Sequence, residues 1–214
     1  LPPRGSFLLR EHIGYTDLSQ ELRLSTAASQ PLRFTLGAYY YQGRRNVAGR
    51  ERIDPCTGLA QAADRDRDEI GNRAIFGALA WEFLDHWTAG LELRWAEDEV
   101  TVTSLPVAAG PTRYTATPEN ITPRMTLDWR PTEPVGLYVN VSKGTKPPDF
   151  NPRVPDERYR AVGEESAWNY EVGMKALFPE QRLSLALAGY RLDVKNQQVT
   201  ELVELPAGGT ASIL

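Results

Sequence analysis

The chain has 214 residues, a net charge of −4, a pI near 5.4 and a mean hydropathy of −0.42. An acidic chain without a basic stripe argues against nucleic acid as a partner. The length suits one large β domain or a piece of a larger one, and no run approaches the roughly 18 apolar residues that a membrane helix needs.

Taken in order, the chain predicts a series of strands. Residues 1–17 lack a regular pattern, so we expect a loop there with one short strand at 7–10. Beyond them, apolar and polar side chains alternate in segments that are mostly about 9–13 residues long, and alternation with a period of two is typical of a half-buried strand. These segments are 18–26, 32–43, 70–83, 88–100, 121–130, 137–142, 166–178 and 182–194, and a further strand begins at 210–214.

The clearest pattern lies in residues 120–151, which predict two strands joined by a turn at 131–134. One face of the first strand is apolar and the other is charged, because successive side chains of a strand point to opposite faces. The apolar set is Ile121, Pro123, Met125, Leu127 and Trp129, and the polar set is Thr122, Arg124, Thr126, Asp128 and Arg130. The charged face either contacts water while the apolar face packs in a sandwich, or lines an aqueous lumen while the apolar face contacts lipid.

The connections between the expected strands alternate in length. Short ones are expected at 27–31, 84–87, 131–134 and 179–181, and long polar ones at 44–69, 101–119 and 145–165. This indicates an antiparallel meander with tight turns at one end and long loops at the other, as in outer-membrane barrels. The strands also suit a tilted crossing of a bilayer, which takes about 9–11 residues, better than a sandwich with strands of about 5–6.

Large aromatic residues lie near the ends of the expected strands. Such side chains favour the lipid–water boundary, where barrels carry them as girdles, although an aromatic residue can equally fill a core. The predicted girdle residues are Trp81, Trp87, Trp95, Trp129, Trp168 and Tyr170.

Several blocks resemble, in the same order, the barrel of TonB-dependent outer-membrane receptors of the siderophore-receptor type. They are L-S-Q-E-L-R-L-S, I-T-P-R-M-T-L-D-W-R-P-T, L-Y-V-N-V-S-K-G-T-K-P-P-D-F-N, E-E-S-A-W-N-Y-E-V-G-M-K and Y-R-L-D-V-K-N-Q-Q-V. The resemblance implies an all-β, up-and-down meander of about eight or nine long strands, from a transmembrane barrel of roughly 22. Residues 1–214 are then a single segment of that barrel, because the sequence holds no counterpart of the family's plug domain.

The resemblance also implies a function. It predicts a receptor in the cell outer membrane that takes up ferric siderophores or a similar scarce nutrient. Its expected partners are the lipid bilayer, the small-molecule ligand and the TonB complex, the last through the absent plug. Two open alternatives are a small porin-like barrel and a soluble β-sandwich binding module, and an outer-membrane barrel enzyme is a weaker one.

No group of residues predicts catalysis, a cofactor or a metal site. The two histidines, His12 and His86, are far apart, and no histidine lies near the single Cys56, whose partner, if it has one, would lie outside this segment. Asp64, Asp66 and Asp68 are interleaved with arginines and lack the glycine of a calcium loop. We therefore expect no enzyme.

Arginine and tyrosine side chains in the long connections are the candidate ligand contacts. An anionic chelate would suit guanidinium and aromatic groups, although a solvated loop surface explains the same residues. The predicted contacts are Arg153, Arg158, Tyr159 and Arg160, with Arg44, Arg45, Arg50 and Arg52 as weaker candidates.

Overall fold

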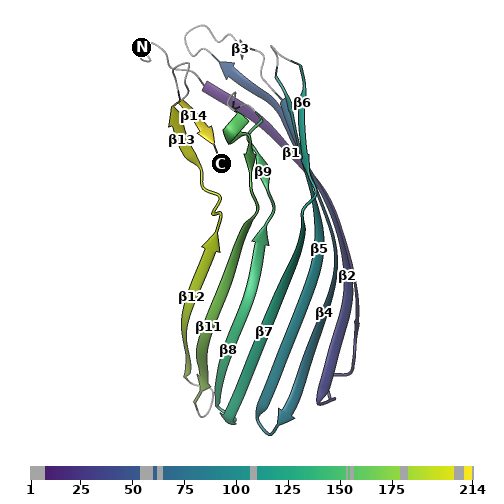
Figure 1. Cartoon of the computed structure of the whole chain (residues 1–214), viewed down its shortest axis with the longest axis vertical. Coiled ribbons are helices and arrows are strands. Elements are labelled where there is room, and N and C mark those ends of the chain that lie inside the picture. Colours follow the sequence, from purple (N-terminus) through teal and green to yellow (C-terminus); the bar gives the residue numbers. More distant parts are fainter. Residues whose placement is uncertain are drawn as a thin grey trace.

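A computed structural model describes residues 8–53, 60–61, 65–106, 110–152, 154, 157–178, 183–204 and 210–213. Over these residues, one antiparallel sheet carries eight long strands that follow each other in chain order (Figure 1). They are β1 (Leu8–Ser25), β2 (Leu32–Ile53), β4 (Arg65–Leu84), β5 (Trp87–Leu105), β7 (Glu119–Thr132), β8 (Val135–Lys146), β11 (Glu165–Leu177) and β12 (Ser184–Lys195). The all-β meander of eight or nine strands is therefore confirmed.

Short elements complete the fold at the upper end of Figure 1. Two small strands pair with members of the main sheet, β3 (Ala60–Gln61) with β2 and β6 (Thr112–Ala116) with β5. Two small hairpin pairs stand apart from it: β9 (Asp149–Phe150) with β10 (Ala161–Val162), and β13 (Glu201–Glu204) with β14 (Thr210–Ile213). The 3-10 helix η1 (Glu157–Tyr159) lies between β9 and β10.

One face of the sheet is apolar from strand to strand. The register aligns the apolar positions of neighbouring strands, so that a single row runs through Phe34, Leu79, Leu91, Met125, Val141 and Tyr170. Leu79, Leu91 and Met125 are 41%, 46% and 56% exposed. No second layer of described residues covers this face, so the soluble sandwich does not describe these strands.

The opposite face carries polar side chains, and three of them are more deeply buried than the apolar ones. Asp98, Asn120 and Asn140 are only 8%, 9% and 8% exposed. The sheet thus reverses the arrangement of a water-soluble protein, in which apolar side chains are inside and charged ones outside.

Four strands are much longer than the expected 9–13 residues. β1, β2, β4 and β5 have 18, 22, 20 and 19 residues, so that prediction is wrong for them. Their upper parts occupy much of the segments 44–69 and 101–119, which we expected to be loops. Polar residues predominate there around a few buried apolar ones, Val47, Val100 and Val102, and cross-strand ion pairs such as Arg44–Glu69 (2.8 Å) and Arg45–Asp68 (2.7 Å) link the strands.

The loop predicted for residues 11–17 is wrong, whereas the short strand expected at 7–10 is, from Leu8 on, the start of β1. β1 begins at Leu8 and pairs with β2 along its length, with a register shift between Arg10 and His12. That shift breaks the alternation on which the sequence prediction depended. His12 is accordingly in a strand, whereas His86 occupies the expected turn with φ of 70°.

Short and long connections still alternate, although β2, β4, β5 and β6 leave the long ones shorter than expected, and the turn expected at 179–181 lies outside the described residues. Tight turns at 85–86 and 133–134 lie at the lower end of the sheet, and η1 with β9 and β10 lies at the upper end (Figure 1). Cys56 and Asp64 fall outside the described residues. Among the helices of the described part, none has the length and apolar character to cross a membrane.

Candidate functional site

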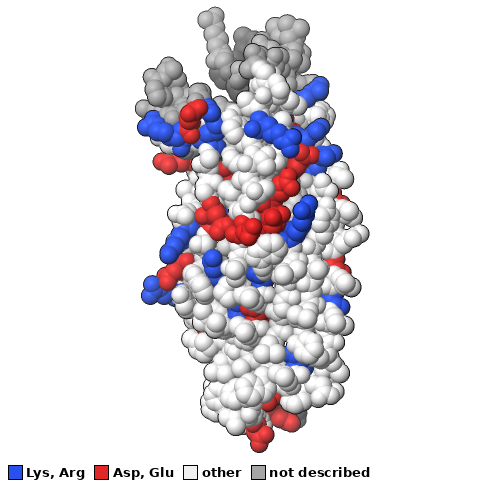
Figure 2. Space-filling view, turned by 45° about the vertical axis from the view of Figure 1, so that its right-hand side comes forward, with Lys and Arg blue, Asp and Glu red and all other residues white. Residues whose placement is uncertain are grey.

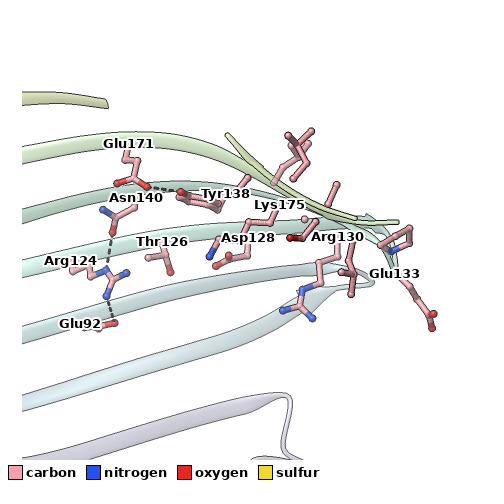
Figure 3. Close-up of a pocket in the computed structure, with 18 residues that line it drawn as sticks. Glu92, Arg124, Thr126, Asp128, Arg130, Glu133, Tyr138, Asn140, Glu171 and Lys175 are labelled. Carbon is pink, nitrogen blue, oxygen red and sulfur yellow. Dashed lines mark hydrogen bonds and ion pairs between the residues drawn. The ribbon is translucent and has the colours of Figure 1, made fainter. Parts of the chain in front are cut away.

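A hollow of about 740 Å³ lies on the polar face near the short turns (Figure 3). Side chains from β5, β7, β8, β11 and β12 line it, so the polar face is the inner side of the curved sheet. Most of the residues labelled in Figure 3 are charged or polar, which suits contact with water or with a polar partner.

Hydrogen bonds across neighbouring strands organise this hollow. The Arg124 Nε donates to Asn140 Oδ1 at 2.8 Å, and Arg124 Nη1 lies 3.6 Å from Glu92 Oε1. The Tyr138 hydroxyl donates to Glu171 Oε1 at 2.5 Å. Figure 3 shows Arg124 between its two partners. These contacts tie β5 to β7, β7 to β8, and β8 to β11.

A second network lies higher on the same face. The Arg94 Nη2 donates to Asn72 Oδ1 at 2.7 Å, and Asn72 Nδ2 donates to Asp98 Oδ1 at 2.5 Å. Asn120 Nδ2 donates to the other Asp98 oxygen at 2.8 Å. The buried Asp98 carboxylate is thereby hydrogen-bonded on both oxygens, which offsets its loss of hydration.

The networks do not form an arrangement for catalysis or metal binding. Each pairs a charged group with an amide, a hydroxyl or an opposite charge, and none joins a nucleophile to a general base. Across the residues that the structure describes, no three His, Cys, Asp or Glu side chains are grouped so as to hold a metal ion.

The aromatic residues of the apolar face form two groups, a lower level next to the tight turns and an upper level further along the strands. The lower one contains Trp81, Trp87 and Trp129, with the rings of Trp87 and Trp129 stacked at 5.3 Å. The upper one contains Trp95, Trp168 and Tyr170, of which the last two stack at 6.4 Å. Trp87 and Trp95 are eight residues apart on β5, about 27 Å along a strand that rises roughly 3.4 Å per residue.

Charged residues begin on the outer face directly above the upper level. The Trp95 Nε1 donates to Glu119 Oε2 at 3.3 Å, and Arg73 lies 3.9 Å from Glu97. Arg44 and Glu69 continue this charged region higher on the strands. Figure 2 shows charged side chains gathered in the upper part of the molecule above a mainly uncharged lower part.

Three predicted ligand contacts lie together at the upper end, in a segment that we call the strap (residues 147–152 and 157–163). Arg158 lies over the Tyr159 ring at 5.6 Å, and Arg160 pairs with Glu157 at 3.1 Å. Asn151 fixes this turn, since its Nδ2 donates to Tyr159 O and its N donates to Arg160 O, both at 2.8 Å. Arg153 lies outside the described residues.

The strap also contacts β6 through residues that the sequence reasoning missed. Tyr114 of β6 stacks on Phe150 of β9 with ring centroids 5.6 Å apart, and the Arg160 guanidinium lies 5.8 Å from the Tyr114 ring. The sequence showed only that Tyr114 and Phe150 lie in two different long connections, which gave no hint that the two residues meet.

The weaker candidates lie elsewhere. Arg44 and Arg45 belong to β2, where cross-strand ion pairs engage them, and so they are not loop residues. The side chains of Arg50 and Arg52 lie outside the described part of the structure.

Known proteins are similar to this chain over the whole of the main sheet. The family model described as TonB dependent receptor-like, beta-barrel, matches residues 4–211. The metal-pseudopaline receptor CntO of Pseudomonas aeruginosa is 28% identical over 136 residues, which cover 62% of this chain and 19% of that receptor.

Solved structures share the fold at low sequence identity. The ferric yersiniabactin uptake receptor FyuA from Yersinia pestis superposes with a TM-score of 0.77 and 18% identity, over 92% of this chain and 31% of that one. The ferric-catecholate import receptor Fiu from E. coli K12 gives a TM-score of 0.69 and 14% identity, over 95% and 34% of the two chains. The chain therefore corresponds to a part of each of these receptors.

Proposed function

Because this chain belongs to the TonB-dependent receptor-like β-barrel family, we propose that it forms part of the barrel wall of an outer-membrane receptor that imports a chelated metal. The observation that carries the proposal is the inverted sheet, whose apolar face is exposed while its polar face is hydrogen-bonded across strands and in part buried. Acyl chains would solvate the first face and an aqueous lumen the second.

The two aromatic levels support the membrane position. Eight residues of a strand tilted by about 40° rise roughly 20 Å, close to the apolar band of about 25 Å that lies between the girdles of a barrel. Trp81, Trp87 and Trp129 would then lie at one interface, and Trp95, Trp168 and Tyr170 at the other. The charged upper parts of β2, β4 and β5 would stand outside the bilayer.

The ligand class follows from the strap and from the names of the relatives. Those receptors are named for complexes of metals with small chelators, and such complexes are often anionic. Arg158, Tyr159 and Arg160 on the strap offer guanidinium and aromatic groups to an anion. Energy would come from the TonB complex through a plug domain that residues 1–214 do not include. We assign no catalytic step.

Uptake by the full-length receptor tests the proposal. A host without receptors of its own is given the full-length protein and supplied with radiolabelled ferric yersiniabactin or a metal–pseudopaline complex. We expect uptake of at least one probe, and its loss in cells without TonB. Uptake that persists without TonB would contradict the proposal.

A matched pair of arginines tests the ligand contacts in the same assay. Arg158→Ala removes an exposed cation from the strap, whereas Arg73→Ala removes an exposed cation from the outer face. We expect only Arg158→Ala to weaken binding of the transported probe. Equal affinities of the two variants for the probe would show that the strap does not contact the ligand.

A further inference from the structure

Gln198 lies outside the strap, between β12 and β13, and its side chain contacts both ends of the strap. Its Nε2 donates to Pro147 O at 2.8 Å and to Gly163 O at 3.0 Å. The strap leaves β8 at the first of these residues and returns towards β11 at the second. One amide group thus joins the departing and returning chain at the base of the strap.

The chemistry of the contact fixes how the amide is oriented. Two carbonyl oxygens require two N–H donors, which the amide nitrogen of glutamine supplies and its oxygen cannot. Around this contact, the Gln198 backbone N donates to Glu165 Oε2 at 2.7 Å. Nearby, Asn196 adopts a positive φ of 53° and its Nδ2 donates to Glu164 O at 3.4 Å. The side chain is therefore directed at the base of the strap from a backbone tied to the start of β11.

A second set of contacts holds the strap just beyond its base. Phe150 stacks on Tyr114 of β6, and Arg160 lies against the same ring. Phe150 pairs with Ala161, so this stack lies close to the base, and Arg158 and Tyr159, two of the proposed ligand contacts, lie beyond it. A loop that is attached at two separate places has fewer accessible conformations than one attached only through its own chain ends.

We propose that Gln198 is a positioning residue, whose amide clasps the base of the strap and thereby sets the location of the ligand contacts that the strap carries. The clasp itself is independent of any ligand. The effect on ligand affinity rests on the proposed function above.

Hydrogen exchange in the full-length receptor tests the clasp. Gln198→Glu keeps the size of the side chain but replaces the two donors by oxygens that repel the carbonyls of Pro147 and Gly163. We expect about tenfold faster exchange of the backbone amides in 157–163, which corresponds to losing roughly one to two hydrogen bonds. Gln197→Glu makes the same charge change at the neighbouring exposed residue and should leave this exchange unchanged.

A donor-retaining variant separates the clasp from a general loss of structure. Gln198→Lys keeps N–H donors on a flexible side chain, so exchange in 157–163 should stay close to that of the unmodified receptor. The heat-dependent shift of folded barrels in gel electrophoresis identifies receptors that have not folded, and Gln198→Ala is measured if Gln198→Glu fails that test. Equal exchange in the Gln197 and Gln198 variants would overturn the proposal.

Binding of the probes then tests the positioning role. With ferric yersiniabactin or metal–pseudopaline, whichever the receptor transports, Gln198→Glu should raise Kd about tenfold and leave uptake at saturating probe unchanged. Faster exchange with an unchanged Kd would refute the positioning role. If the unmodified receptor binds neither probe, the proposed ligand class fails, while the exchange experiment still decides whether the clasp exists.

Discussion

At the scale of single residues, the polar face places aromatic rings flat against glycines of the neighbouring strand. Phe76 is paired in register with Gly37, and Tyr138 with Gly173, and a Cβ added to either glycine would overlap the ring. A cation approaches each ring, with Arg23 at 5.5 Å from Phe76 and Lys175 at 5.6 Å from Tyr138. A ring that covers a glycine in this way stays close to the sheet and compensates for the missing side chain.

Gly173→Ala tests this arrangement. The new Cβ would force the Tyr138 ring away from β11 and disturb the hydrogen bond from its hydroxyl to Glu171. We expect a loss of about 1–3 kcal/mol in the free energy of unfolding, as for overpacked sites. The measurement is denaturant unfolding of the full-length receptor in lipid vesicles. Gly144→Ala is the control, because a Cβ there has no atom within 4 Å, and equal losses would show that the Tyr138 ring is not held by Gly173.

At the scale of elements, the strands divide into a lower and an upper zone, and different interactions specify the strand structure in each. In the lower zone, alternation of apolar and polar residues specifies both faces, and the sequence predicts these segments correctly. In the upper zone, β2, β4 and β5 continue although polar residues predominate and the buried apolar ones are few, namely Val47, Val100 and Val102. The strands there are linked by ladder hydrogen bonds and by cross-strand pairs such as Arg45–Asp68.

Two adjacent arginines of β2 test the contribution of these pairs. The Asp68 side chain is 23% exposed, so Arg45→Met would leave a largely buried carboxylate without its partner. We expect it to destabilise the upper strands by about 1–3 kcal/mol. Arg44→Met should destabilise the upper strands less, by about 0–1 kcal/mol, because the Arg44 side chain is 49% exposed.

Hydrogen exchange of residues 65–70 measures both variants in the full-length receptor. Exchange that is faster in Arg45→Met than in Arg44→Met is the expected order. The reverse order would mean that the outer pair, and not the inner one, stabilises the upper strands.

At the scale of the whole molecule, the two faces of the sheet are proposed to contact different solvents, acyl chains on one side and the aqueous lumen on the other. Leu91 lies midway along β5 between Trp87 and Trp95, on the face proposed to contact acyl chains. Thr126 lies on the opposite face, beside Gly90 of β5. The same new side chain would therefore contact lipid at position 91 and the aqueous lumen at position 126.

Arginine at these two positions tests which solvent each face contacts. Leu91→Arg should destabilise the receptor in vesicles by about 2–4 kcal/mol, the penalty for a cation near the bilayer midplane. Thr126→Arg should destabilise the receptor much less. Unfolding titrations of both variants give the comparison, and similar losses would argue that the apolar face does not contact lipid.

The sequence by itself determined the number of long strands, their order, and which face of each is apolar. It could do so because the period of two is a local property that Leu91, Met125 and their neighbours carry without reference to any partner. It also placed Arg158, Tyr159 and Arg160 in a connection.

Only the tertiary structure decided how far β2, β4 and β5 extend, that Tyr114 meets Phe150, and that Gln198 joins the two ends of the strap. Each of these depends on contacts between residues distant in the chain, which no local pattern encodes. Where a strand carries mostly polar residues, pairing with the neighbouring strand defines the element, and that pairing becomes visible only once the sheet has formed.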